Sequence, residues 1–151
     1  MLILGEAGIG KSSLLTALAG EVTADGGTAQ VGRAIPGGGT YRAFSSALAP
    51  LLRALPADPP AELLPYRTAL GRLAPAWSNG ATTGDSASGV DPVVLLGEGL
   101  LRLLTSRGIA AAGCLLGLED LHWADPDTLA VVGYLADAAR STPVLIVADL
   151  A

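Results

Sequence analysis

The sequence contains little of what several common kinds of site and partner require. Its 151 residues include one cysteine, one histidine and one lysine, and only 15% of them are charged. A single cysteine, Cys114, excludes an internal disulfide and a multi-cysteine metal site, and its apolar surroundings are typical of a buried, unreactive thiol. The lone histidine, His122, likewise excludes a cluster of histidine metal ligands.

Basic charge and long apolar runs are also scarce. The net charge is −5, which argues against direct contact with nucleic acid. A membrane span needs about 18 apolar residues in a row, and the most apolar stretches are shorter or carry Glu98 and Arg102. With no signal-peptide pattern at the start, we expect a cytoplasmic protein without membrane contact. The length and the 50% hydrophobic content predict one ordered domain.

Apolar stretches alternate with helix signals along the chain. Short strands are expected at Met1–Leu4, Thr28–Ile35, Gly113–Glu119 and Pro143–Ala148. Helices are expected at about Lys11–Val22, with Leu14 on its apolar face, and at about Tyr41–Leu55, Ala61–Leu73, Asp91–Ser106 and Asp125–Arg140. Strands that alternate with helices predict an α/β fold, with a parallel sheet covered by helices on both faces.

Aspartate followed by proline marks the start of two of these helices. Asp91 and Asp125 are expected as N-cap acceptors, because the next residue is a proline whose missing N–H costs nothing there. Gly108 is placed to cap the end of the first of these two helices. By contrast, Ser78–Val90 is polar and low in complexity, and we expect it to be a mobile loop.

The turn after the first strand carries the most specific motif. Its residues fit G-x-x-x-x-G-K-[ST] at every fixed position, and they are Gly5, Glu6, Ala7, Gly8, Ile9, Gly10, Lys11 and Ser12. Glycines let backbone N–H groups approach phosphate oxygens, and the helix N-terminus that continues through Ser13 favours an anion. Lys11 can reach the β and γ phosphates, and the Ser12 hydroxyl is suited to bind Mg²⁺. The motif therefore predicts binding of ATP or GTP, and we expect ATP with Mg²⁺.

A second motif, which is acidic, lies at the end of the strand expected at Gly113–Glu119. An apolar strand ending in Glu119 and Asp120 resembles a Walker B segment, which places carboxylates beside the phosphates. Glu119 is predicted to hold Mg²⁺, and Asp120 to orient and deprotonate an attacking water, so Asp120 and Lys11 are the predicted catalytic residues. Gly117 is unexpected within this strand, because glycine weakens a strand interior.

These two motifs together resemble a known family. The P-loop and the segment from Glu119 to Leu129 look like the AAA-type ATPase domain of bacterial signal-transduction NTPases with numerous domains. Such domains occur in large LuxR-type transcription regulators and in some cyclase-linked proteins. The resemblance extends to Val31–Pro36 and so covers nearly the whole chain. It implies a three-layer P-loop fold in which the strand at Pro143–Ala148 lies between the P-loop strand and the acidic strand.

The same resemblance implies that the chain, 1–151, is a partial ATPase core. The family's fifth strand and helical lid would be missing, Asp149 would stand near the polar sensor position, and the P-loop strand would form an exposed edge that favours self-association. Two functions stay open: an ATPase switch module of a regulatory protein, or a nucleotide-binding or protein-interaction module without useful turnover. A small-molecule kinase is a third, less favoured hypothesis. The sequence does not indicate an effector or a partner protein.

Overall fold

The structure is a computed structural model that describes residues 1–56, 59–74, 77, 89–106 and 112–150. These residues form a four-stranded parallel sheet in the order β1-β4-β3-β2. The strands are β1 (Leu2–Leu4), β2 (Thr28–Arg33), β3 (Cys114–Glu119) and β4 (Val144–Leu150). The parallel α/β fold is therefore confirmed, and so is the expected position of the last strand between the first and the acidic one.

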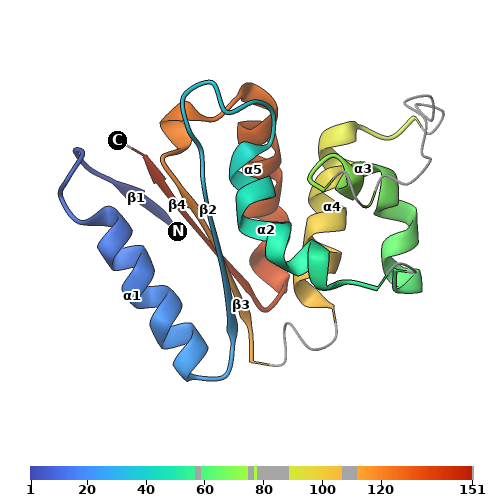
Figure 1. Cartoon of the computed structure of the whole chain (residues 1–151), viewed down its shortest axis with the longest axis horizontal. Coiled ribbons are helices and arrows are strands. Elements are labelled where there is room, and N and C mark those ends of the chain that lie inside the picture. Colours follow the sequence, from blue (N-terminus) through green and yellow to red (C-terminus); the bar gives the residue numbers. More distant parts are fainter. Residues whose placement is uncertain (57–58, 75–76, 78–88, 107–111, 151) are drawn as a thin grey trace.

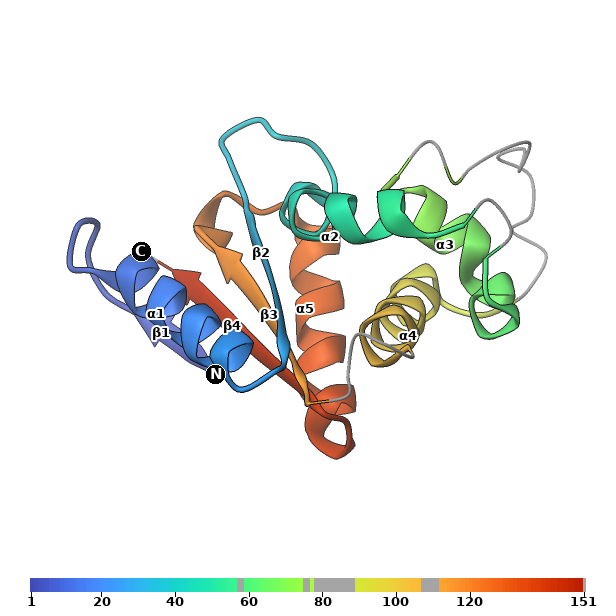
Figure 2. The same ribbon diagram turned by 60° about the horizontal axis from the view of Figure 1, so that its bottom comes forward.

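Helices cover both faces of this sheet (Figure 1). They are α1 (Lys11–Ala24), α2 (Arg42–Ala54), α3 (Arg67–Gly71), α4 (Pro92–Thr105) and α5 (Pro126–Ala138), with short 3₁₀ turns η1 (Ala61–Tyr66), η3 (Leu121–Trp123) and η4 (Ala139–Ser141). Helix α1 lies on one face, whereas α2 and α5 lie on the other, with α3 and α4 beyond them (Figure 2). This arrangement gives the three layers expected from the sequence.

Three details differ from the sequence-based expectations. The helix expected at about Ala61–Leu73 is divided into η1 and α3, because Pro65 lies inside it and cannot donate to a regular α-helix. Leu14, expected on the apolar face of α1, is 54% exposed, and Leu15 is the buried residue. The predicted cap Gly108, and all but the last two residues of the predicted loop Ser78–Val90, lie outside the described ranges.

The sheet separates two cores of unequal size. The large core joins α2, α4 and α5 to the strand residues that point to their side, including Leu116, Leu118 and Ile146. The small core is formed by Leu15 of α1 with Leu115 and Val147, which point the other way. Because successive strand residues alternate between faces, Gly117, Glu119 and Asp149 belong to the α1 side. The α1 side therefore carries the charged ends of the strands.

Close backbone packing explains two strand glycines. A Cβ at Gly117 would come within 2.9 Å of both Leu15 methyl carbons, so glycine lets α1 approach β3. At Gly32 a Cβ would lie 2.1 Å from the Ala43 carbonyl oxygen and 2.6 Å from the Ala47 nitrogen. Helix α2 therefore lies directly on the β2 backbone, and the unexpected Gly117 has a packing role.

Cys114 is buried and forms no disulfide, and burial raises the pKa of its thiol, as expected for an unreactive cysteine. Within the described ranges, every helix is too short or too polar to span a lipid bilayer.

Candidate functional site

The turn between β1 and α1 has the backbone conformation that its glycines allow. Gly8 and Gly10 adopt φ values of 84° and 103°, in the left-handed region that side chains with a Cβ avoid. Gly10 is also the N-cap of α1, and among the described residues no side chain caps that helix end. The N–H groups of the first turn of α1 are thus left to another acceptor, and they carry the positive end of the helix dipole.

Lys11 folds back over this turn. Its Nζ donates hydrogen bonds to the carbonyl oxygens of Gly5, at 2.6 Å, and of Glu6, at 2.9 Å. These carbonyls hold the ammonium beside the glycines, while Gly8, Ile9 and Gly10 are exposed to solvent. One full positive charge is thereby placed next to a helix N-terminus, an arrangement suited to an anion.

The carboxyl ends of the neighbouring strands meet beside this turn. In the parallel register, Arg33 of β2 lies opposite Glu119 of β3, and Asp149 of β4 lies opposite Ile3 of β1, two residues before the turn begins. In Figures 1 and 2 the turn between β1 and α1 lies next to the end of β4. The sheet therefore brings together the P-loop and the acidic segment, which are more than 100 residues apart in the sequence.

Arg33 is paired with both acids of this segment. Its Nη2 and Nε lie 3.0 Å and 3.3 Å from Glu119 Oε2, and its Nε lies 3.4 Å from Asp120 Oδ2. The hydrogen bond to Glu119 is the main cause of a raised Arg33 pKa. The Arg33 side chain is 51% exposed, whereas that of Glu119 is only 12% exposed. The guanidinium thus covers an acid that is itself largely enclosed by the protein.

Asp120 is held by its backbone. It has a φ of 56°, in the left-handed region, and its N–H donates a hydrogen bond to Asp149 Oδ1. Asp149 is 1% exposed, and its other oxygen, Oδ2, has no hydrogen-bond partner within the described part of the chain. The end of β4 therefore fixes the orientation of the residue that follows β3.

A second network anchors the connection after β2. The Asp125 carboxylate accepts from the Thr128 N–H at 3.0 Å, which makes it the N-cap of α5 as expected. It also accepts from the Thr128 hydroxyl and from the Tyr41 N–H, and Tyr41 has a φ of 61°. Burial alone would raise the Asp125 pKa, but these hydrogen bonds outweigh it and lower the pKa. Asp125 thus joins the starts of α2 and α5.

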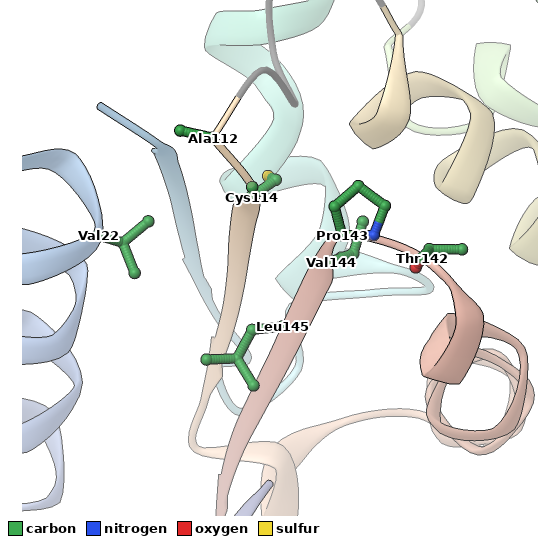
Figure 3. A pocket seen from close by; sticks show the side chains of 8 residues that line it. Val22, Ala112, Cys114, Thr142, Pro143, Val144 and Leu145 are labelled. Carbon is green, nitrogen blue, oxygen red and sulfur yellow. The ribbon is translucent and has the colours of Figure 1, made fainter. Parts of the chain in front are cut away.

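Two cavities beside the sheet lie away from this site. One, of about 320 Å³, is at the opposite end of the strands, between Val22 of α1 and residues such as Cys114 and Leu145 (Figure 3). Another, of about 380 Å³, lies between α5 and the strands β1 and β4. Among the described lining residues, the first has no charged side chain, and in the second the only charged side chain is that of Arg140. Neither cavity includes a P-loop residue.

The sequence-predicted site residues thus lie at the carboxyl ends of the strands. The P-loop follows β1, and Glu119 and Asp120 lie at the end of β3. Sequence reasoning missed Arg33 as a partner of these acids and Asp149 as the acceptor for Asp120. The available signal for Arg33 was its place near the end of an expected strand. In a parallel sheet, the ends of the strands meet at the same edge.

A left-handed glycine turn between a parallel strand and an uncapped helix, with a lysine over it, defines a P-loop class of fold and site. Comparison with protein families agrees: the family model described as AAA ATPase domain matches residues 1–147. The chain therefore belongs to the AAA ATPase domain family. No curated protein and no solved structure matches it.

Proposed function

We propose that this chain binds ATP with Mg²⁺ at Gly5–Ser13 and serves as an ATP-dependent switch module of a signal-transduction or transcription-regulatory protein. The observation that carries the proposal is the turn itself. Left-handed Gly8 and Gly10, an uncapped α1 N-terminus and the Lys11 ammonium together suit a polyphosphate. Membership of the AAA ATPase domain family supports nucleotide as the anion.

Ser12 in the first turn of α1 and Glu119 at the end of β3 have the chemistry to bind a magnesium ion. The Ser12 hydroxyl and the Glu119 carboxylate are oxygen donors, which Mg²⁺ prefers. The described residues contain no group of three or more carboxylates, histidines or cysteines that would form a complete protein cage. That is the expected situation for Mg²⁺, which is commonly held by one or two protein groups together with substrate phosphates. When bound, it would neutralise charge on the phosphate oxygens.

Each remaining residue has a defined part in this proposal. Lys11 offsets phosphate charge, and the backbone of Gly5, Glu6, Ala7, Gly8, Ile9, Gly10 and Ser13 surrounds the phosphates with N–H groups. Asp120 is the candidate to accept a proton from an attacking water. Its backbone is held in one orientation by Asp149, so the carboxylate starts from a defined direction.

The alternative, a module that binds nucleotide without useful turnover, is favoured by one observation. Arg33 occupies both acids that hydrolysis would require, Glu119 and Asp120. A carboxylate whose oxygens accept from a guanidinium is less accessible to an attacking water or to a metal ion. Under either alternative, nucleotide binding is the shared property.

The proposal is tested by comparing nucleotides that differ only in phosphate number. Titration of the purified chain with ATP, ADP and AMP in MgCl₂ should give affinities in that order, because Lys11 serves the β and γ phosphates and AMP has neither. AMP bound as tightly as ATP would contradict the proposal, since the base or ribose would then dominate recognition. Binding of none of the three would reject it outright.

A further inference from the structure

We propose that Arg33 and Mg²⁺ compete for Glu119, so that Arg33 acts as a built-in antagonist of metal binding at the nucleotide site. This inference rests on the proposed function. It concerns a residue outside both motifs, and it assigns a regulatory role to an ion pair that joins β2 to β3.

The geometry places Arg33 on the carboxylate that the metal needs. Two nitrogens of the Arg33 guanidinium, Nη2 and Nε, donate to the same Glu119 oxygen, Oε2, at 3.0 Å and 3.3 Å. A divalent cation bound at or near this carboxylate would lie close to the guanidinium, and two cations within a few ångströms repel each other. Metal binding therefore requires Arg33 to leave Glu119 or to weaken its contact.

The environment of the pair makes such an exchange practical. Arg33 is 51% exposed, so its side chain can turn into solvent without leaving a buried charge behind. Water already competes for the exposed guanidinium, which weakens the pair, so a divalent cation can displace it from Glu119. Glu119 cannot follow, because it is 12% exposed and belongs to the end of β3. Arg33 is thus the movable partner.

Asp120 links the exchange to the other acid. Arg33 Nε lies 3.4 Å from Asp120 Oδ2, so one guanidinium spans the metal-side acid and the water-side acid. Movement of Arg33 away from Glu119 would also free the Asp120 carboxylate. The Asp120 backbone would stay in place, because its N–H is bonded to Asp149 and not to Arg33. Metal binding and exposure of the candidate base would therefore occur together.

The backbone of Arg33 is fixed independently of its side chain. Its N–H donates to Ser46 Oγ at 2.9 Å, and Ser46 in turn donates to the Ala43 carbonyl oxygen at 3.0 Å. These bonds tie the end of β2 to α2 whether or not the guanidinium is paired. A change of the side chain at position 33 should accordingly leave the strand in place.

The test uses the ratio of two dissociation constants. A fluorescent ATP analogue is titrated into the full chain in EDTA and in MgCl₂, and the affinity gain due to magnesium is the first constant divided by the second. Arg33→Gln should raise this gain about three- to fivefold, the range that a partly exposed ion pair supports. The loss of one positive charge can itself change this ratio, because ATP in EDTA is more negatively charged than Mg–ATP. A Glu119→Gln background separates that effect from competition for Glu119. Arg33→Lys, which keeps the charge but loses the forked contact, should give an intermediate value.

Two controls define the outcome. Arg140→Gln removes the same charge from the exposed pair with Asp137, at the opposite end of the sheet, and should leave the gain unchanged. In a Glu119→Gln background, Arg33→Gln should no longer raise the gain. A gain that is unchanged or lowered by Arg33→Gln in the otherwise normal chain overturns the inference alone. A chain that binds no nucleotide in either buffer rejects the proposed function, and the inference with it.

Discussion

The backbone N–H of Asp120 donates a hydrogen bond to the carboxylate of Asp149, across the ends of β3 and β4. Asp120 adopts a left-handed φ of 56°. This conformation is unfavourable for a residue with a Cβ, and it persists only where contacts with the surroundings offset its free-energy cost. The bond to Asp149 is such a contact. Asp149 is fully enclosed and belongs to the strand beside the P-loop strand. One carboxylate thus sets the backbone of the candidate base and adds negative charge near the phosphate site.

These two effects of Asp149 can be separated by substitution. Asp149→Asn keeps the acceptor oxygen but removes the charge, so ATP affinity should rise about two- to fivefold, as expected for one partly screened charge. Asp149→Ala leaves the Asp120 N–H without its acceptor and should lower the free energy of unfolding by about 1–3 kcal/mol. Calorimetric titration and urea denaturation measure the two quantities. Weaker ATP binding by Asp149→Asn would show that the negative charge is needed.

Close packing of α2 on β2 predicts a large effect of one methyl group. Gly32→Ala would push a Cβ into the Ala43 carbonyl oxygen, so the free energy of unfolding should fall by about 1–3 kcal/mol or more. Gly133→Ala is the matched control, because a Cβ added there in α5 would meet no atom of another element within 4 Å. At that position alanine should stabilise the chain by about 0.5–1 kcal/mol through helix propensity. Equal effects at the two positions would refute the packing argument.

The Asp125 network predicts a specific response to acid. Its folded-state pKa is lowered, so its contribution to stability is present above the unfolded-state pKa of about 3.9 and is lost as the pH falls through the lower folded value. Asp125→Ala should cost about 1–2 kcal/mol at neutral pH, the range of a lost N-cap. The difference in unfolding free energy between the two proteins should shrink below about pH 4. A difference that stays constant down to about pH 2 would mean that the charge of Asp125 is not involved.

Hydrolysis by this chain should be slow. Magnesium must first compete with Arg33 for Glu119 before Asp120 is free, and Asp149 adds negative charge near the end of the P-loop strand, where a transition state would need positive charge. We therefore expect phosphate release well below the roughly 1–100 s⁻¹ typical of competent phosphoryl-transfer enzymes. Asp120→Asn should change so low a rate little. Turnover above about 1 s⁻¹ that disappears in Asp120→Asn would identify a working ATPase in which Arg33 is no obstacle.

Much of the fold could be predicted from local patterns. The alternation of apolar strands with helices indicated the parallel sheet, and aspartate followed by proline marked the starts of α4 and α5, where Asp91 and Asp125 are indeed the N-caps. Glycines were expected where the P-loop backbone must approach phosphate closely, and Gly8 and Gly10 adopt the left-handed conformation that glycine allows. Each of these features depends on residues within a few positions of one another. The position of β4 between β1 and β3 came instead from the family resemblance.

The features that could not be predicted depend on contacts between distant segments. Arg33 and Glu119 are 86 positions apart, and only the register of β2 with β3 brings them together. The role of Asp149 followed from β4 extending to Leu150, two residues beyond the expected strand end. Gly117 weakens an isolated strand, and its advantage is evident only when Leu15 is packed against it. The register and helix packing that decide these contacts are properties of the assembled sheet.

The central claim, that the P-loop binds the phosphates of Mg–ATP, is tested most directly by calorimetric titration of the chain and of Lys11→Ala with ATP in MgCl₂. The account predicts measurable binding by the unaltered chain and its near-complete loss in the variant, because the ammonium over Gly5 and Glu6 offsets phosphate charge that backbone N–H groups alone do not. Circular dichroism should show an unchanged fold, since among the described residues the hydrogen bonds of the Lys11 ammonium go to the Gly5 and Glu6 carbonyls of the turn and not to the core. Unchanged ATP affinity in a folded Lys11→Ala protein would contradict the account.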